Sequence, residues 1–271
     1  MSFNVDNEIQ EVIKNRILKN KHYSFHNTEQ YNLKLDDPIA LYNNGNQWKI
    51  IPLKISFSYP IIYDTYSHED EKYDVSIIIC PITLQSVMFK GKFKFFKYEN
   101  LKMILTEDND LMPIDLNYKI NDKFVIQENK RIEVKILTLK NAIMFAPDAE
   151  FMKCHKKIKP IFNLKYYSDY NDIYGQQLPL GNIHPKTLVY VVRYGINKTK
   201  EDKHVILLGN DSNKSMPTGY DIKKSNLLDH LIKFRSKIIN KDGYIMPIFW
   251  YVAKKMYDTA DVVYINDDLK L

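Results

Sequence analysis

The stretch Ile77-Ile-Ile-Cys-Pro81 decides the fold of this chain. It lies inside a region from Pro52 to Met112 in which apolar residues recur with the period of two that is typical of β-strands. A run of β-branched residues that stops at a proline indicates a buried strand followed by a turn. The sequence therefore predicts a β-sheet core here, and no grouping of residues within it identifies a reaction.

Further strands are predicted outward from this centre. β-Branched and aromatic residues favour strands over 48–57 and 75–88, and the polar segment 68–72 between them reads as a solvated loop. Phe89-Lys-Gly-Lys-Phe-Lys-Phe95 alternates strictly, which predicts phenylalanines on one face and lysines on the other. Phe96 falls out of phase, which indicates a bulge or a strand end. Additional strands are predicted at 124–126, 132–136, 188–192, 205–208 and 262–265.

Helical patterns lie near the two ends of the chain. Asn7 and Gln10 have the spacing of a capping box, and the apolar residues that follow predict an amphipathic helix over 7–19. One C-terminal helix is predicted to begin at Ser225, and another over 247–256 is opened by its proline. The sequence thus predicts an α+β fold: a predominantly antiparallel β-sheet domain with an N-terminal helix and one or two C-terminal helices.

Length and composition favour one domain with additions. The 271 residues are 45% hydrophobic and can bury a sizeable core, and no linker rich in glycine, proline or serine interrupts them. We predict an N-terminal helix or arm over 1–25 and a single β-rich domain over 26–271, with a helical addition at about 222–258.

Charge, cysteine content and residue usage bear on partners and location. The net charge of +6 is mild compared with the dense basic stripe of nucleic-acid-binding proteins. Two cysteines cannot build a disulfide framework, the first residues lack a signal-peptide pattern, and no apolar run approaches the roughly 20 residues of a membrane span. Heavy use of Asn, Lys, Ile and Tyr indicates an AT-rich genome, as in some protists, bacteria and giant DNA viruses. We therefore expect an intracellular (cytoplasmic) or virion protein that is not secreted.

Short segments of the chain together match one known pattern. They are Pro52-Leu-Lys-Ile55, Ile61-Ile-Tyr-Asp-Thr65, Ile79-Cys-Pro81 with Ser86, Asn100-Leu-Lys-Met103 with Leu111, and His184-Pro-Lys-Thr187. These segments resemble the core of the bacterial family known as domain of unknown function 3179, over about residues 50–195. The resemblance implies a shared fold. It implies no reaction, because the activity of that family is itself unknown.

The chain departs from that family at two places. Where the family has a Trp-His-Glu group before its Asp-Thr pair, this chain has Ser58, Tyr59 and Pro60. The family's Cys-Pro-x-Cys has become Cys80-Pro-Ile-Thr83, so the second thiol is absent. The resemblance therefore implies that metal, acid-base or thiol chemistry through those groups has largely been lost here.

Asp64, Cys80 and His184 are the candidate site residues. Cys80 beside a turn-forming proline can be a nucleophile, but its place after three isoleucines favours a buried structural thiol. Asp64 joins His68-Glu-Asp70 as the densest acidic group, which can do acid-base work but reads as a solvated loop. His184 precedes a proline and can act as a base, although such a residue more often hydrogen-bonds in a turn.

Metal and cofactor motifs are missing from the sequence. Cys154 and His155 are adjacent, so on a strand they point to opposite faces, and no other histidine has zinc-ligand spacing. There is no Gly-x-x-x-x-Gly-Lys phosphate loop. We predict no cofactor and no metal ion. A basic cluster before Pro160 reads as a solvated loop or as one that contacts an anion, and it consists of Lys153, Lys156, Lys157 and Lys159.

The sequence favours a non-catalytic structural or protein-interaction protein whose many tyrosines serve contacts with protein partners. A component of a giant-virus particle or of another large assembly is one concrete form of this hypothesis. The alternative is an enzyme, or a small-molecule-binding or metal-binding domain, with a pocket near Asp64, Cys80 and His184. Nucleic-acid binding ranks third because the charge is mild. The sequence does not determine the oligomeric state.

Overall fold

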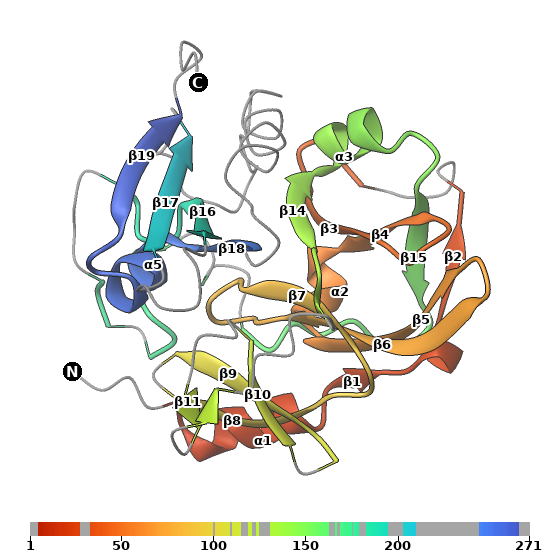
Figure 1. The fold of residues 1–271 in the computed structure, drawn as a ribbon, viewed down its shortest axis with the longest axis horizontal. Coiled ribbons are helices and arrows are strands. Elements are labelled where there is room, and N and C mark those ends of the chain that lie inside the picture. Colours follow the sequence, from red (N-terminus) through yellow and green to blue (C-terminus); the bar gives the residue numbers. More distant parts are fainter. Residues whose placement is uncertain are drawn as a thin grey trace. The chain divides into compact units, whose positions relative to one another are not determined.

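The structure is a computed structural model, and the chain divides into two compact units, 1–163 and 164–271, each of which is described by itself. Within the described residues, the first unit combines short helices with many strands, and the second combines the helix α5 with four strands (Figure 1). The predicted α+β class, mostly antiparallel with an N-terminal and a C-terminal helix, is confirmed. The predicted division into an arm and a single domain stays a prediction. The described residues are 5–27, 33–99, 101–108, 110–114, 119–120, 123–124, 131–162, 166, 169–174, 176–178, 183–194, 203–209 and 244–265.

The first unit holds most of the strands. Its helices are α1 (Asn7–Lys14), α2 (Leu53–Ser56) and α3 (Leu139–Phe145), with the 3-10 turn η1 (Asn20–His22). Its longer strands are β2 (Tyr23–His26), β3 (Pro38–Asn43), β4 (Trp48–Pro52), β5 (Ile61–His68), β6 (Glu71–Ile79), β7 (Ser86–Lys90), β8 (Lys94–Glu99), β9 (Lys102–Glu107), β10 (Asp110–Pro113), β14 (Lys135–Thr138) and β15 (Glu150–Cys154). Its two-residue strands are β1 (Ile17–Leu18), β11 (Lys119–Ile120), β12 (Lys123–Phe124) and β13 (Arg131–Ile132).

Two five-stranded sheets, in the orders β1-β5-β6-β7-β13 and β14-β3-β4-β15-β2, form the centre of the first unit, beside the smaller sheet β10-β9-β8. The isoleucine run lies on β6, the central strand of its sheet. Ile77, Ile78 and Ile79 are at most 1% exposed although alternate residues of a strand face opposite sides. Both faces of β6 are therefore covered, and each isoleucine contributes about 1.5–3 kcal/mol by its burial.

The second unit contains a four-stranded sheet with the order β18-β16-β17-β19. Its strands are β16 (Leu188–Tyr194), β17 (Lys203–Gly209), β18 (Tyr244–Phe249) and β19 (Asp261–Ile265), and its helix is α5 (Trp250–Met256). The strands predicted at 188–192, 205–208 and 262–265 are confirmed, each with somewhat wider bounds.

The N-terminal helix is shorter than predicted. α1 ends at Lys14, where the Asn15 side chain donates a hydrogen bond to the Glu11 carbonyl oxygen (2.9 Å), and the chain then enters β1, which pairs with β5. The predicted capping box is wrong as well. The Gln10 side chain instead accepts a hydrogen bond from the Tyr98 backbone N–H (3.0 Å), which fastens α1 to β8 (Figure 1).

Three of the predicted strands are shortened or divided. The strand predicted over 48–57 ends at Pro52, and α2 follows directly. The strand predicted over 75–88 is interrupted after Ile79 by a turn, in which the Cys80 N–H donates to the Gln85 carbonyl oxygen (2.9 Å). The strand predicted over 132–136 is divided between β13 and β14, and of 124–126 only the first residue lies within the described residues.

The alternating Phe89–Phe95 segment is not one strand, because Gly91 adopts a positive φ of 118° and turns the chain from β7 into β8. The predicted faces are nevertheless confirmed. The three phenylalanines are at most 3% exposed, while the intervening lysines are exposed. The predicted irregularity at Phe96 is also confirmed, because the β8–β9 register shifts between Phe95 and Lys97.

The C-terminal helix does not begin at its proline. Pro247 lies within β18, where it pairs with Tyr190 of β16, and α5 starts only at Trp250. β18 is an edge strand, where a residue without an N–H is tolerated. The helix predicted from Ser225, with most of the helical addition at 222–258, lies outside the described residues.

Candidate functional site

Asp64 is buried between the two five-stranded sheets of the first unit. Its side chain projects from β5 and is 8% exposed. The Tyr42 hydroxyl on β3 donates a hydrogen bond to Oδ2 (2.6 Å), and the Tyr23 hydroxyl on β2 lies 3.1 Å from Oδ1. The carboxylate therefore cross-links the two sheets. The sequence-based expectation of a wet loop is wrong for Asp64, although Glu69 and Asp70 do form the exposed turn between β5 and β6.

The Tyr42 hydroxyl is a dedicated donor to Asp64, whereas the Tyr23 hydroxyl shares its proton between the Tyr63 carbonyl oxygen (2.6 Å) and Asp64 Oδ1 (3.1 Å). Burial raises the pKa of Tyr42 well above its usual value, and the negative charge of Asp64 raises it further. The same two causes raise the pKa of Tyr23. Both hydroxyls consequently stay protonated at ordinary pH and keep their hydrogen bonds, which suits a structural link between sheets.

Cys80 is an interior thiol. It is 0% exposed, its Sγ lies 3.1 Å from the Tyr98 hydroxyl oxygen, and the Thr83 N–H lies 3.4 Å from Sγ. Burial raises the pKa of Cys80, and the hydrogen bonds from Thr83 and Tyr98 oppose this only in part. The predicted burial is confirmed, and the protonated thiol is a poor nucleophile.

The burial of Cys80 predicts that its thiol reacts slowly in the native protein. In a Cys154→Ser variant, Cys80 is the one remaining cysteine, and we expect its reaction with a disulfide reagent to be at least roughly a hundredfold slower in native buffer than in urea. The rate is measured by the absorbance of the released chromophore. The Cys80→Ser variant, which keeps the partly exposed Cys154, is the matched control and should react readily. Native Cys80 reacting faster than a free thiol would contradict the interior assignment.

Ser58, Tyr59 and Thr83, the positions at which the sequence was predicted to depart from a similar family, make hydrogen bonds within the first unit. The Tyr59 hydroxyl donates to the Lys157 carbonyl oxygen (2.9 Å), and the Ser58 hydroxyl donates to the Lys54 carbonyl oxygen (2.9 Å). Thr83 is fully buried within the turn after Cys80, where its hydroxyl donates to the Gln85 side-chain oxygen (3.2 Å). The Tyr59 bond links two distant segments, and the Ser58 and Thr83 bonds hold local turns.

His184 belongs to the second unit, so its predicted grouping with Asp64 and Cys80 stays a prediction. It is 5% exposed, its Nδ1 accepts a hydrogen bond from the Lys186 backbone N–H (3.2 Å), and the Thr187 N–H donates to its carbonyl oxygen (2.9 Å). The Tyr170 ring lies 4.1 Å from the imidazole, centroid to centroid. His184 is thus a turn residue whose Nδ1 acts as an acceptor.

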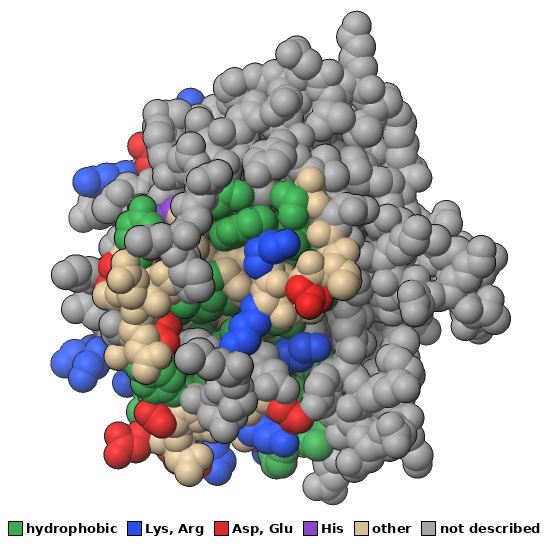
Figure 2. Space-filling model, turned by 90° about the vertical axis from the view of Figure 1, so that its left-hand side faces the viewer, with side chains coloured by type: hydrophobic (Ala, Val, Ile, Leu, Met, Phe, Trp, Pro, Cys, Tyr) green, Lys and Arg blue, Asp and Glu red, His purple; other side chains and the backbone are tan. Residues whose placement is uncertain are grey.

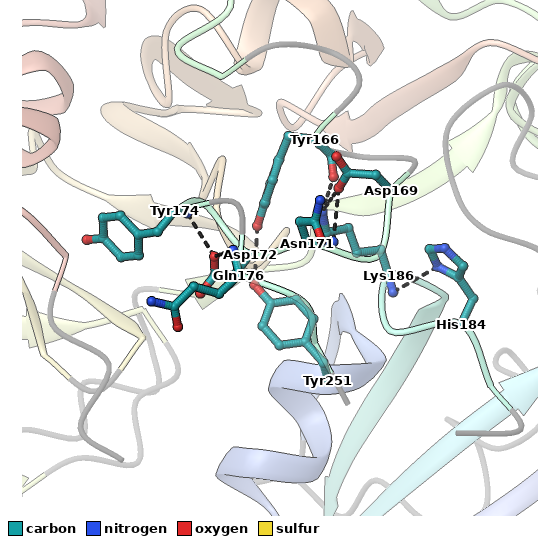
Figure 3. A network of polar contacts seen from close by, with 9 residues as sticks. All are labelled: Tyr166, Asp169, Asn171, Asp172, Tyr174, Gln176, His184, Lys186 and Tyr251. Carbon is teal, nitrogen blue, oxygen red and sulfur yellow. Dashed lines mark hydrogen bonds and ion pairs between the residues drawn. The ribbon is translucent and has the colours of Figure 1, made fainter. Parts of the chain in front are cut away.

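Lys186 is a buried cation that the sequence did not reveal as a site residue (Figure 3). Its side chain is 0% exposed, donates to the Tyr166 carbonyl oxygen and lies 3.1 Å from Asp169 Oδ1. Burial lowers the pKa of Lys186 to about 8, although the hydrogen bond and charge of Asp169 oppose that change. A single lysine after Pro185 forms no recognisable sequence pattern, so only its surroundings in the structure identify it.

The pair of Lys186 and Asp169 lies next to a hydrogen-bonded loop that is described over 169–174 and 176–178. Asp169 Oδ1 also accepts from the Asn171 N–H (3.1 Å), and Asp172 Oδ1 accepts from the N–H groups of Tyr174 and Gln176 (2.8 Å each; Figure 3). The Leu178 N–H donates to the carbonyl oxygen of Tyr170 (2.7 Å), which closes the loop. Tyr170 and Tyr174 remain 44% and 39% exposed, so this fixed backbone presents two tyrosines.

The described part of the chain gathers no three His, Cys, Asp or Glu side chains that could hold a metal ion. Among its helices, none has the length and apolarity needed to cross a membrane. No family model, curated protein or solved structure matches this chain.

Proposed function

We propose that this chain is a non-catalytic structural or protein-interaction protein. The observation that carries the proposal is the state of Asp64 and Cys80, which are both buried and hydrogen-bonded to tyrosine hydroxyls inside the first unit. A nucleophile or general base must reach a substrate and change its protonation state. These two groups instead stabilise the sheets.

The proposed kinship with domain of unknown function 3179 agrees with this view. Ser58, Tyr59 and Thr83, which stand at positions where the chain departs from the family, are hydrogen-bonded within the first unit, and Tyr59 reaches Lys157. A diverged relative that has kept the sheet and lost its reactive groups would serve as a scaffold.

The hydrogen-bonded loop segments 169–174 and 176–178 support an interaction role. Tyrosine offers a large contact area with few rotors, and a loop that is ordered before binding loses little entropy on association. On the face in Figure 2, basic and acidic side chains are interspersed around hydrophobic ones over the described part, a mixture that suits protein contacts better than a long polyanion. Membership of a giant-virus particle or another large intracellular assembly is the concrete form that we propose.

The test compares binding by the wild-type chain with binding by a Tyr170→Ser/Tyr174→Ser variant. We expect the wild type to self-associate or to retain a stoichiometric partner from its source, and the variant to weaken that association roughly tenfold or more. Light scattering and quantitative cross-linking measure it. The control, Leu35→Ser/Met144→Ser, removes two exposed apolar side chains of the first unit. A wild-type chain that stays at 32.1 kDa and retains nothing would refute the proposal.

A further inference from the structure

A pocket of about 360 Å³ in the first unit has predominantly basic walls. Most of its lining comes from the segment between the end of α1 and η1, and one residue comes from the chain just after β15. The lining residues are Lys14, Asn15, Ile17, Lys19, Lys21, His22 and Lys156.

Strand pairing creates this pocket from two distant segments. β15 runs antiparallel to β2 with Cys154 opposite Tyr23, and the His155 N–H donates to the His22 carbonyl oxygen (2.8 Å). This pairing carries Lys156, a member of the basic cluster recognised in the sequence, to the lysines near the N-terminus. The convergence of two basic segments on one hollow concentrates positive charge there.

The positive charge of the pocket is largely uncompensated. No carboxylate is among the described residues that line it, and of its described lysines Lys14 alone is paired, with Glu11 at 3.2 Å on an exposed helix face. Within the described residues, no ion pair joins Lys19, Lys21 or Lys156 to an acidic side chain. Desolvation lowers the pKa of His22, and the charges of Lys156 and Lys21 lower it further. A bound anion would relieve this repulsion.

We propose that the basic pocket, formed by Lys14, Lys19, Lys21, His22 and Lys156, binds a compact, multiply charged phosphate group. Lysine ammonium groups are point charges that suit phosphate oxygens, and the planar guanidinium fork that suits carboxylates is absent from the lining. The described lining contains no Tyr, Phe or Trp side chain that could stack a base. The small volume and this lining favour a short phosphate chain over a nucleic-acid strand. The inference does not depend on the proposed function.

Calorimetric titration with inorganic tripolyphosphate at low salt is the first test. We expect one site per chain, and binding weakened roughly tenfold in the Lys21→Gln/Lys156→Gln variant, since each exposed lysine contributes a factor of about two to five. The matched control is Lys140→Gln, which removes an exposed lysine of α3 that does not line the pocket. Its affinity should equal that of the wild type.

The pKa of His22, followed by NMR, is the second test. Tripolyphosphate should raise it, because the anion stabilises the imidazolium form, and affinity should increase as the pH falls through this pKa. A His22→Gln variant should lose that part of the pH dependence. Absence of binding, equal weakening by Lys140→Gln, or tighter binding of a single-stranded DNA oligonucleotide at the same phosphate concentration would overturn the proposal.

Discussion

Asp64→Ala is expected to lower the free energy of unfolding of the first unit by about 2–4 kcal/mol. The carboxylate is 8% exposed and is the acceptor for the fully buried Tyr42 hydroxyl at 2.6 Å. Removing it leaves that hydroxyl without this partner, at a cost of about 1–3 kcal/mol, and the lost volume adds to the penalty. Because the bond joins β5 to β3, the defect should loosen both five-stranded sheets.

The two tryptophans of the chain allow this measurement, because Trp48 lies in the first unit and Trp250 in the second. Urea unfolding followed by Trp48 fluorescence in a Trp250→Phe background reports on the first unit. Combining Asp64→Ala with Tyr42→Phe removes both members of the bond. The combined cost should therefore be smaller than the sum of the two single costs. Strictly additive costs would argue against a direct Asp64–Tyr42 bond.

The second large effect concerns the pair of Asp169 and Lys186 in the second unit. Asp169→Ala leaves the buried Lys186 ammonium without its counter-charge. We expect this to lower the free energy of unfolding by about 2–3 kcal/mol at pH 7. The value lies at the lower end for buried pairs because the Asp169 side chain is 27% exposed. Lys186→Met fills the same space without a charge, and its cost should be less than half as large. Equal costs would show that the ion pair is not the reason for the defect.

The pH dependence of the Asp169 and Lys186 pair has a definite sign. Burial lowers the pKa of Lys186 from 10.5 to about 8, so between these values the unfolded chain binds more protons than the folded chain. The contribution of Lys186 to stability therefore rises as the pH increases from about 8 to 10.5 and is level outside that window. The cost of Asp169→Ala should shrink between pH 7 and 9.5, because a neutral amine needs no counter-charge. Urea unfolding followed by Trp250 fluorescence in a Trp48→Phe background measures the cost of Asp169→Ala at each pH. A cost that does not change with pH would contradict this account.

Local patterns in the sequence were sufficient to predict the β-rich core and the buried and exposed faces of the segment 89–95. The alternation of Phe89 to Phe95 correctly assigned buried and exposed sides, and the phase change at Phe96 located the bulge, because side-chain direction along a strand depends on neighbouring residues only. Boundaries were harder to predict. The turn at Gly91 and the early end of α1 at Lys14 follow from pairing with segments far along the chain.

The candidate site was only partly accessible to sequence reasoning. Cys80 was correctly assigned to the interior because three isoleucines precede it. Asp64 was misplaced because the charged residues that follow it suggested solvent, whereas its partners Tyr23 and Tyr42 precede it by 41 and 22 positions. The burial of Lys186 had no local signal at all.

The sequence by itself determined the β-rich α+β class, the buried isoleucine strand, and the buried and exposed faces of the segment 89–95. These features depend on the periodicity of side chains along the backbone. Only the tertiary structure decided which polar groups meet: the carboxylate of Asp64 with two tyrosine hydroxyls, Lys186 with Asp169, and Lys156 with the N-terminal lysines. The energies of these groups are set by burial and by charges within a few ångströms. Those distances arise from the pairing of strands that are remote in the chain, which no local pattern specifies.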